Sequence, residues 1–523
     1  MRNKLFTTAI AAVSLLAVAC LKERLNTDAS AETITQNSYQ ITAAPAFGTL
    51  VDSGVYRLRG VSSLPAGPVV EVTGNSSAEN QPIQQWSWFP NGGQKWRLIK
   101  TDATYYKLVN ITSSKCLKSP NATSGQILQQ GTDDGSDAQR WSITYVASSA
   151  NVYTLTNKAT GFKMVIDPES NTPGAKMRQK STVTGTQDRF EFHNLEFQNP
   201  LNNNGRPDPY VAQKDGFYYF LSTKGNKIAI TKTQDMSLLA IAPETTVWTP
   251  PTGTDHSGSI WAPELYFLSG KWYIYFAAAD PAVADSHHMF VLENPNSDPT
   301  TGTWTFKGKI YDTADQWAID GTVLTIGSTN YFVWSGWENT ATKYKQYIYL
   351  ATMTNPWTIS GTRVKISSPT NNWERYEPSG NLGAGVNEAP IAIQKDASCP
   401  VFIIYSASRY SSDNYCLAQI QLTSGGSPTV ATDWINKKQV FVKSDANSVY
   451  GPGHNGFFTS SHTDGNGTFK SENWFIYHAR SVANTSNGSR TSRMQKLSWN
   501  ADGSPNFGTA AATSSKLAVP IGE

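Results

Sequence analysis

Trp272-Tyr273-Ile274-Tyr275-Phe276 is an unbroken run of aromatic and β-prone residues that begins two places after the turn residue Gly270. Such a run predicts a buried β-strand after a turn. Four further runs of this kind are Phe217-Tyr218-Tyr219-Phe220, Tyr331-Phe332-Val333-Trp334, Phe402-Ile403-Ile404-Tyr405 and Trp474-Phe475-Ile476-Tyr477. Five sheet units of about 65 residues each predict a five-bladed β-propeller, whereas a parallel β-helix, the alternative, would have shorter and more even repeats.

A tighter threefold repeat precedes these units. Its units open at Tyr56-Arg57-Leu58, Tyr106-Lys107-Leu108 and Tyr153-Thr154-Leu155, and they close at Gln94-Lys95-Trp96, Gln139-Arg140-Trp141 and Asp188-Arg189-Phe190. Repeats this regular predict a symmetric architecture in which no single unit buries its own core, and three β-units favour a β-trefoil. We place the trefoil at residues 46–194 and the propeller at residues 198–523, because the junction is rich in Asn, Pro and Gly.

The composition agrees with an all-β, two-domain chain. Its 523 residues exceed one ordinary domain, and 39 Gly and 27 Pro indicate many turns. The 43 Lys and Arg nearly balance the 40 Asp and Glu, which argues against a nucleic-acid-binding protein. Aromatic residues make up 11% of the chain, which suits stacking on sugar rings and equally suits large β-cores.

The N-terminus has the pattern of a targeting segment. Arg2 and Lys4 precede an apolar run that is too short for a stable membrane span and ends Leu16-Ala17-Val18-Ala19-Cys20. Small residues before a cysteine resemble a bacterial lipoprotein signal, which implies residues 1–20 as signal and Cys20 as a lipid anchor at the periplasm or cell surface. An ordinary signal peptide cut nearby is the alternative. Residues 21–45 predict a flexible tether.

Three carboxylates stand in apolar, Pro- or Gly-flanked settings, namely Asp208, Asp320 and Glu388. Asp320 lies 11 residues before Tyr331, Glu388 lies 14 before Phe402, and Asp208 has a similar place before the first aromatic run. Because a propeller gathers its innermost strands around one channel, we expect these acids at matched blade positions around one mouth. Paired carboxyl groups are the chemistry of glycoside hydrolysis.

The propeller segment resembles glycoside hydrolase family 43. The matching motifs are Arg206-Pro207-Asp208-Pro209, Trp261-Ala262-Pro263-Glu264-Leu265, Ile319-Asp320-Gly321, Asn387-Glu388-Ala389-Pro390 and Gly453-His454-Asn455-Gly456. The resemblance implies hydrolysis with inversion, with Asp208 as general base, Glu388 as general acid and Asp320 as modulator of the acid's pKa. It favours release of terminal α-L-arabinofuranosyl residues from plant polysaccharide. A β-xylosidase or exo-galactanase remains open, as does a catalytically inactive surface glycan-binding protein.

Further residues complete the expected site. We predict Trp261, Trp317 and Trp337 as walls of the sugar pocket, and the family resemblance implies that Arg480 reaches substrate hydroxyls; a salt bridge is the alternative. By the same resemblance His454 lies near a central cation, commonly calcium, reached through water; a neutral structural histidine is the alternative. No cofactor is required for the chemistry.

The Gln-x-Trp closings make the trefoil resemble the ricin-B type of lectin. In that family an acidic residue early in each unit binds a sugar hydroxyl, which makes Glu71 and Asp167 the candidates here, while unit two carries Lys118. A docking module with degenerate sugar sites is the alternative.

We expect the protein to be a monomer. Three cysteines follow Cys20 in the sequence. Cys399 and Cys416 flank a predicted hairpin and are candidates for pairing in an oxidising compartment, although spacing alone does not establish the bond.

Overall fold

The computed structural model describes residues 50–523, except residues 64–66, 90, 148–150, 202–204, 241, 464–467 and 486–489. The predicted signal at residues 1–20, Cys20 and the tether at residues 21–45 therefore lie outside the described residues. Within the described part of the chain, no helix is long and apolar enough to cross a membrane.

Strands dominate the described chain, and helix is confined to short 3-10 turns. These turns are η1 (Val61–Ser63), η2 (Thr73–Asn75), η3 (Gly92–Gln94), η4 (Asp137–Gln139), η5 (Met236–Leu238), η6 (Thr340–Thr342), η7 (Asn372–Glu374), η8 (Ala431–Asp433) and η9 (Asp445–Asn447). The predicted all-β class is confirmed.

The N-terminal strands form the predicted trefoil. They are β1 (Val55–Gly60), β2 (Val69–Val72), β3 (Ile83–Trp86), β4 (Trp96–Lys100), β5 (Tyr105–Asn110), β6 (Cys116–Lys118), β7 (Gln129–Gly131), β8 (Trp141–Tyr145), β9 (Val152–Asn157), β10 (Lys163–Asp167), β11 (Lys176–Lys180) and β12 (Phe190–Asn194). The aromatic residues that close the units, Trp96, Trp141 and Phe190, are buried in one shared core. The indole N–H of Trp96 donates to the carbonyl of Val70, and that of Trp141 donates to the carbonyl of Leu117, both at 3.1 Å. A core shared by all units explains why the repeat is so regular in sequence.

Five four-stranded antiparallel sheets follow, which confirms the five-bladed propeller and excludes the β-helix. Blade one is β14 (Tyr210–Lys214), β15 (Phe217–Leu221), β16 (Ile228–Thr233) and β17 (Glu244–Trp248); blade two is β18 (Gly258–Leu268), β19 (Lys271–Ala279), β20 (His288–Asn294) and β21 (Thr305–Ile310); blade three is β22 (Ala318–Ile326), β23 (Thr329–Gly336), β24 (Tyr347–Asn355) and β25 (Thr358–Ser367); blade four is β26 (Asn387–Ile393), β27 (Phe402–Ala407), β28 (Cys416–Leu422) and β29 (Trp434–Phe441); blade five is β30 (Tyr450–Thr463), β31 (Phe469–Arg480), β32 (Thr491–Trp499) and β33 (Pro505–Asn506).

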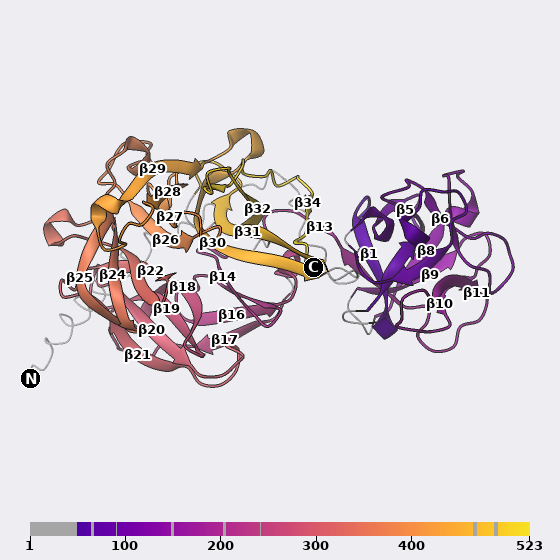
Figure 1. Cartoon of the computed structure of the whole chain (residues 1–523), viewed down its shortest axis with the longest axis horizontal. Coiled ribbons are helices and arrows are strands. Elements are labelled where there is room, and N and C mark those ends of the chain that lie inside the picture. Colours follow the sequence, from indigo (N-terminus) through magenta and orange to yellow (C-terminus); the bar gives the residue numbers. More distant parts are fainter. Residues whose placement is uncertain are drawn as a thin grey trace, which may run out of the picture. The chain divides into compact units, whose positions relative to one another are not determined.

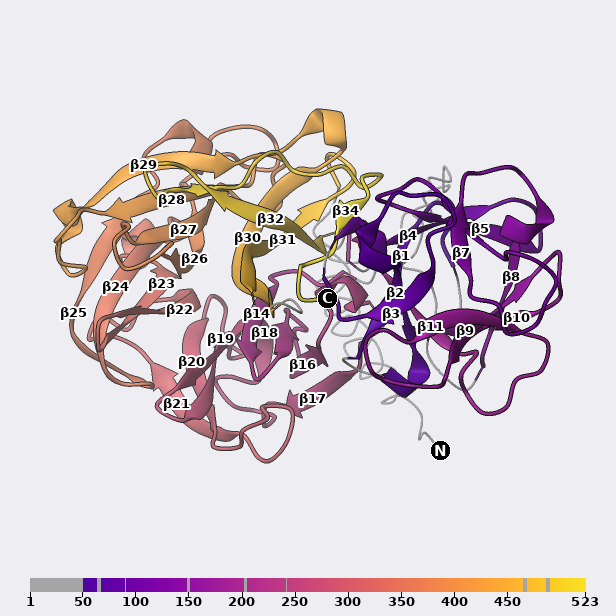
Figure 2. The same ribbon diagram turned by 45° about the vertical axis from the view of Figure 1, so that its right-hand side comes forward.

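The innermost strands of the blades gather around the propeller centre, while the last strands of the first four blades lie at the periphery (Figures 1 and 2). Each innermost strand contacts the next, and β30 contacts β14, so the ring closes between blades five and one. Outside the blades, β13 (Glu196–Phe197) pairs with β34 (Leu517–Ala518). The first residues of every blade therefore face one axis, which is what brings residues distant in sequence together.

Each aromatic run of the sequence forms the second strand of its blade. Tyr275 and Phe276, neighbours on β19, are both fully buried, and they belong to two different apolar clusters. Because blades pack on both faces of the sheet, both sets of side chains along this strand leave water. That burial is why these runs lack the polar alternation of a half-exposed strand.

The described cysteines do not pair. Cys116, Cys399 and Cys416 are free thiols. Cys416 pairs with Ala407 at the end of β27, whereas Cys399 precedes the start of that strand at Phe402. Five residues of extended chain span about 16 Å, which is far beyond disulfide reach. The candidate bond is therefore ruled out by the length of the hairpin.

Candidate active site

One residue near the start of each innermost strand has a left-handed backbone. These residues are Asp208, Ala262, Asp320, Ala389 and His454, with φ values of 57°, 42°, 54°, 50° and 49°. In β18, β22, β26 and β30 the strand register slips at this residue, and pairing resumes two places later. In blade one, pairing begins at Tyr210, also two places later. We call this the bulge position; such bulges re-aim side chains beside active sites.

The bulge position refines the expected equivalence of the three acids. Asp208 and Asp320 occupy it, and His454 occupies it in blade five. Glu388 lies one residue before it, because Ala389 is the bulge residue of blade four. The prediction of three matched positions is therefore wrong for Glu388, although the propeller still brings all three acids to one cavity.

That cavity has a volume of about 400 Å³. Its lining combines acids, bases and aromatic rings: Asp208, Asp285, Asp320, Glu388, Arg409, Arg490, His454, Trp261, Trp317, Trp337, Tyr344, Tyr410, Thr223, Gln346, Ile319 and Val386. The residues come from all five blades and their connecting loops. Of the residues predicted from sequence for the propeller site, only Arg480 is missing from this lining.

Asp208 is held by contacts to both of its carboxylate oxygens. Thr223 donates its hydroxyl to Oδ2 at 2.6 Å, while Arg490 Nη1 lies 3.0 Å from Oδ1. The same Thr223 oxygen accepts the backbone N–H of Ala262 at 2.8 Å, so the bulge of blade two is joined to the acid of blade one. Burial raises the pKa of Asp208, but the Arg490 guanidinium and the contacts to His454 and His478 outweigh it and hold that pKa well below its ordinary value. Asp208 is therefore ionised near neutral pH.

Glu388 and Asp320 are shifted in the opposite direction. Burial raises the pKa of Glu388 to about 7, the nearby Asp208 charge adds to this, and a hydrogen bond of 2.8 Å from the Tyr415 hydroxyl opposes it. Burial and the charges of Glu388 and Asp208 also raise the pKa of Asp320 well above its ordinary value. Asp320 Oδ2 accepts the backbone N–H of Ala389, which fixes it beside the residue that follows Glu388. One carboxyl with a lowered pKa, Asp208, beside one whose pKa is raised to about 7, Glu388, is an acid and base arrangement.

Two histidines flank Asp208. His454 Nδ1 lies 3.4 Å from Asp208 Oδ1, and its backbone N–H donates to the Ser406 hydroxyl at 2.7 Å. His478 Nδ1 accepts the backbone N–H of Asp208 at 3.1 Å, and burial lowers its pKa to about 3. His478 is therefore neutral, with the proton on Nε2. Both rings thus contact Asp208 and fix its orientation.

The three tryptophans line the cavity in two different ways. The indole of Trp261 stacks on His287 with ring centroids 3.8 Å apart. Trp317 and Trp337 stack on each other at 4.8 Å, and only 5% of Trp337 is exposed. Both line the cavity, and Trp317 is the less buried of the two, so it offers more ring surface to a ligand.

Comparison with known proteins identifies this arrangement. Residues 197–505 match the description "Glycosyl hydrolases family 43". The chain belongs to this family. Residues 39–123 and 92–180 match "Ricin-type beta-trefoil lectin domain-like".

Two curated relatives and one solved structure show how close the likeness is. The chain is 37% identical over 327 residues to an extracellular exo-α-(1→5)-L-arabinofuranosidase of Streptomyces avermitilis, covering 61% of this chain and 64% of the relative. It is 34% identical to α-L-arabinofuranosidase 43 of Humicola insolens, covering 58% of this chain and 61% of the relative. The match thus spans less than two thirds of each relative. The crystal structure of an α-L-arabinofuranosidase from Lactobacillus brevis superposes with a TM-score of 0.54 at 31% identity, covering 61% of this chain and 98% of that one.

Arg480 of this family 43 chain does not lie where the sequence reading placed it. It is 1% exposed, pairs with Asp413 at 2.6 Å and donates to the carbonyl of Ser411. The predicted contact with substrate is therefore replaced by the salt bridge that stood as its alternative. Arg490, ten residues later, lines the cavity instead, as does Arg409.

Sequence reasoning also missed Thr223 and Tyr415, the hydroxyl donors to Asp208 and Glu388. Thr223 follows the aromatic run of blade one, but nothing in its local sequence marks it as a site residue. Tyr415 is fully buried just before β28 and stacks on His478 with centroids 5.7 Å apart.

Glu264 lies two places after the bulge position of blade two and is 3% exposed. The Tyr266 hydroxyl donates to it at 2.9 Å and also lies 2.6 Å from the Thr322 hydroxyl. Burial raises the pKa of Glu264 to about 8. The raised pKa makes Glu264 a neutral buried group near pH 7, and because it does not line the cavity it is not a fourth catalytic acid.

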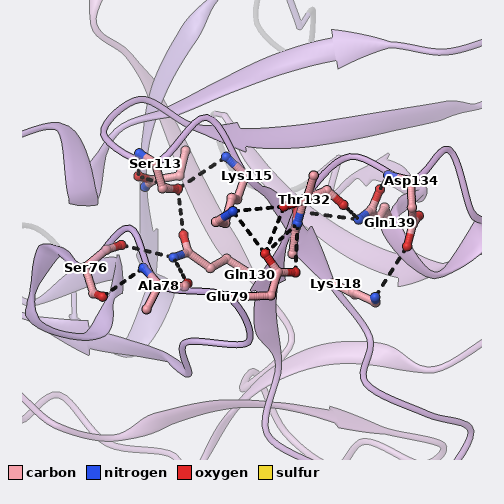
Figure 3. A network of polar contacts seen from close by, with 12 residues as sticks. Ser76, Ala78, Glu79, Ser113, Lys115, Lys118, Gln130, Thr132, Asp134 and Gln139 are labelled. Atoms are coloured by element: carbon pink, nitrogen blue, oxygen red, sulfur yellow. Dashed lines mark hydrogen bonds and ion pairs between the residues drawn. The ribbon is translucent and has the colours of Figure 1, made fainter.

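The trefoil keeps one acid of the expected kind. Both oxygens of Glu71 accept side-chain hydrogen bonds, from Gln84 at 2.7 Å and from Gln94 at 2.9 Å. The equivalent residue in unit two, Lys118, instead pairs with Asp134 at 3.4 Å. Figure 3 shows that pair together with Gln130, which donates to the carbonyls of Ser76 and Ala78.

Gln130 has counterparts in the other units, and they locate the equivalent of Glu71 in unit three. Gln85, Gln130 and Gln179 each donate to two backbone carbonyls, and they pair across the sheet with Val70, Leu117 and Met164. The residues that follow these partners are Glu71, Lys118 and Val165. Asp167 thus lies two places beyond the expected position, and its oxygens pair with Lys180 at 2.9 Å and Arg178 at 3.6 Å.

Proposed function

We propose that the chain is an inverting, exo-acting glycoside hydrolase that releases terminal α-L-arabinofuranosyl residues from plant polysaccharide. The observation that carries this proposal is that Asp208, paired with Arg490, and Glu388, buried without a cationic partner at hydrogen-bond distance among the described residues, line one cavity, and their pKa values are shifted in opposite directions. The names of the two curated relatives favour arabinofuranosides as the substrate class.

In the proposed reaction, protonated Glu388 gives its proton to the glycosidic oxygen as the bond from that oxygen to the anomeric carbon breaks. Ionised Asp208 takes a proton from a water molecule whose oxygen bonds to the anomeric carbon from the opposite face. The sugar leaves with inverted configuration, Glu388 is left ionised and Asp208 protonated. Asp320 assists by holding the backbone N–H of Ala389, which orients the chain beside Glu388.

Hydrolysis of 4-nitrophenyl α-L-arabinofuranoside, compared with the β-D-xylopyranoside and with Glu388→Gln as blank, tests this function. Turnover of the arabinofuranoside supports it, together with a loss of at least about 100-fold for Glu388→Gln on α-(1→5)-arabinobiose, whose alcohol leaving group needs the proton. Faster turnover of the xyloside would assign a β-xylosidase. If the chain hydrolyses neither of the two glycosides and neither arabinan nor galactan, the alternative of a catalytically inactive glycan-binding protein is favoured.

We further propose that the trefoil holds the enzyme on its polysaccharide. The match to a lectin-like family and the intact Glu71 cluster in unit one support this. Binding of the Glu388→Gln chain to insoluble arabinan, with and without Glu71→Ala, measures the contribution. Equal retention of both chains would assign the trefoil's role to something other than this cluster.

We also propose export and a lipid anchor on Cys20. The word "extracellular" in the name of one relative and the charged, then apolar, N-terminal sequence support export. The anchor rests on the small residues before Cys20. Mass measurement of the mature N-terminus decides, because an unmodified N-terminus beyond Cys20 contradicts the anchor.

A calcium ion in the channel, held through water, is a proposal that the residues partly fit. No group of three His, Cys, Asp or Glu among the described residues is arranged to bind a metal directly. The buried side-chain amide of Asn455 and Nε2 of His478, however, have no hydrogen-bond partner there, as expected where water enters. His454 and Asn455 would face the ion's water shell. Unchanged melting temperature and activity after chelation would contradict the ion.

A further inference from the structure

Glu374 is a fully buried carboxylate beside the proposed general acid, although it does not line the cavity. Its Oε2 accepts the backbone N–H groups of Thr370 and Asn371, at 2.9 and 2.8 Å, and the side-chain amide of Asn371 at 3.0 Å. Its Oε1 accepts from Asn387 at 2.9 Å and Tyr405 at 3.1 Å, and lies 2.6 Å from Lys437 Nζ. A buried charge is tolerated only when it is fully paired in this way.

The contact to Asn387 links this carboxylate to the catalytic strand. Asn387 is the residue before Glu388 and is itself fully buried. Its Oδ1 accepts the Ser367 hydroxyl at 2.8 Å, and its backbone carbonyl accepts the Ser335 hydroxyl at 2.9 Å. Its backbone N–H donates to the carbonyl of Gln346, a residue that lines the cavity. The residue before Glu388 is thus held by hydrogen bonds at its side chain, its backbone carbonyl and its backbone N–H group.

The other contacts join Glu374 to the rest of blade four. Tyr405 lies on β27 and Lys437 on β29, while Asn387 opens β26. The loop between blades three and four is tied as well, since Val386 donates its N–H to the carbonyl of Glu374 at 2.8 Å. Glu374 therefore fixes the start of β26 against two strands of its own sheet.

We propose that Glu374 is a positioning residue that sets the direction in which Glu388 delivers its proton. This inference rests on the proposed role of Glu388 as general acid. The strand register slips directly after Glu388, so ladder hydrogen bonds hold only one side of this residue. Glu374, acting through Asn387, strengthens the constraint on that same side, where Asn387 and Glu388 are still paired with β27. A displacement of about 1 Å in such a group costs about 100-fold in rate.

Leaving groups of different acidity separate this role from a structural one. Departure of an alcohol from α-(1→5)-arabinobiose needs the proton of Glu388, whereas departure of 4-nitrophenol from its glycoside needs it much less. A misdirected general acid slows the first reaction more than the second. A loss of folded protein slows both equally.

The experiment compares kcat on these two substrates for the wild-type chain, Glu374→Gln, Glu388→Gln and Glu293→Gln. Glu293 is the matched control, because it is also a buried carboxylate that accepts from a tyrosine and a lysine, Tyr273 and Lys271, and it lies in blade two outside the cavity. For Glu374→Gln we expect about a 100-fold loss on arabinobiose and less than about a tenfold loss on the nitrophenyl glycoside. For Glu293→Gln we expect an unchanged ratio.

Equal losses on both substrates, or none, for Glu374→Gln would overturn the inference. If Glu374→Gln does not fold, Tyr405→Phe removes a single donor to the same oxygen and must shift the ratio in the same direction. If Glu388→Gln itself shows no dependence on the leaving group, the proposed catalytic function fails; if only Glu374→Gln shows none, the positioning role fails alone.

Discussion

The hydroxyl of Tyr415 donates a hydrogen bond of 2.8 Å to Oε1 of Glu388. This bond stabilises the ionised carboxylate, and it therefore opposes the burial that raises the pKa of Glu388 to about 7. The proposed acid is thus kept from becoming too weak to give up its proton.

Replacement of Tyr415 by phenylalanine moves the alkaline limb of the pH profile. Without the donor the pKa of Glu388 rises, so the protonated form persists to higher pH. Hydrogen bonds to charged groups contribute about 1.5–3 kcal/mol, so we expect the alkaline limb of the pH profile of kcat/KM to move to higher pH by about one unit. Tyr477→Phe is the control, because the Tyr477 hydroxyl is buried without a partner among the described residues. A limb that stays in place or moves down in Tyr415→Phe contradicts the assignment of Glu388.

Replacement of Arg490 by methionine moves the acidic limb. Arg490 lowers the pKa of Asp208, so its loss raises that pKa, and ionised Asp208 disappears at a higher pH than in the wild type. We expect the acidic limb of kcat/KM to shift upward and the maximum rate to fall. Arg363→Met, which removes a buried pair to Asp312 outside the cavity, should leave the limb unmoved. A shift of equal size in both variants would deny Arg490 this role.

Trp317 presents its ring to the cavity, so Trp317→Ala weakens substrate binding more than it slows the chemistry. We expect KM to rise about tenfold, because loss of one aromatic contact costs about 1–1.5 kcal/mol. The steady-state kinetics of Trp357→Ala serve as reference, since that indole lies outside the cavity lining. If kcat falls while KM holds, Trp317 supports the catalytic acids instead of the sugar.

Glu264 makes stability depend on pH. Its pKa is about 8 in the folded chain and lower once exposed, so unfolding releases a proton between these values. Stability therefore falls as pH rises through this window. Glu264→Gln carries no such proton, and its melting temperature should exceed the wild-type value by more at pH 8 than at pH 5. If the difference in melting temperature between Glu264→Gln and the wild type is the same at both pH values, Glu264 is not a buried neutral group. The control is Glu338→Gln, at an exposed carboxylate, for which we expect this difference to be the same at pH 5 and pH 8.

Blade number and the identity of the site acids were accessible from sequence for a physical reason. The second strand of each blade is buried on both faces, so its aromatic run stands out, and Asp208, Asp320 and Glu388 sit in short apolar motifs. The bulge was not accessible, because Ala262 and Ala389 adopt a left-handed backbone that alanine disfavours in isolation. The register slip of each blade follows from ring packing and not from local preference.

Residues that act across blades were missed for a related reason. Thr223 reaches Asp208 from the end of the second strand of blade one, and Arg490 reaches it from blade five. No local motif marks either of them. In the trefoil, strand register gives Val165 as the third equivalent of Glu71, whereas reading by acidity alone chose Asp167. The sequence does contain a signal for this alignment. Asn110 and Asn157 are equivalent asparagines of units two and three; Asn110 lies six residues before Cys116, and Asn157 lies six residues before Lys163, which places Val165 opposite Lys118.

The anomeric configuration of the first sugar released tests the central claim most directly. Early ¹H NMR spectra of 4-nitrophenyl α-L-arabinofuranoside with the wild-type chain should show β-L-arabinofuranose before mutarotation, because Asp208 activates water on the face opposite the leaving group. Initial release of α-L-arabinofuranose would mean retention, and it would contradict Asp208 as a base that acts on water.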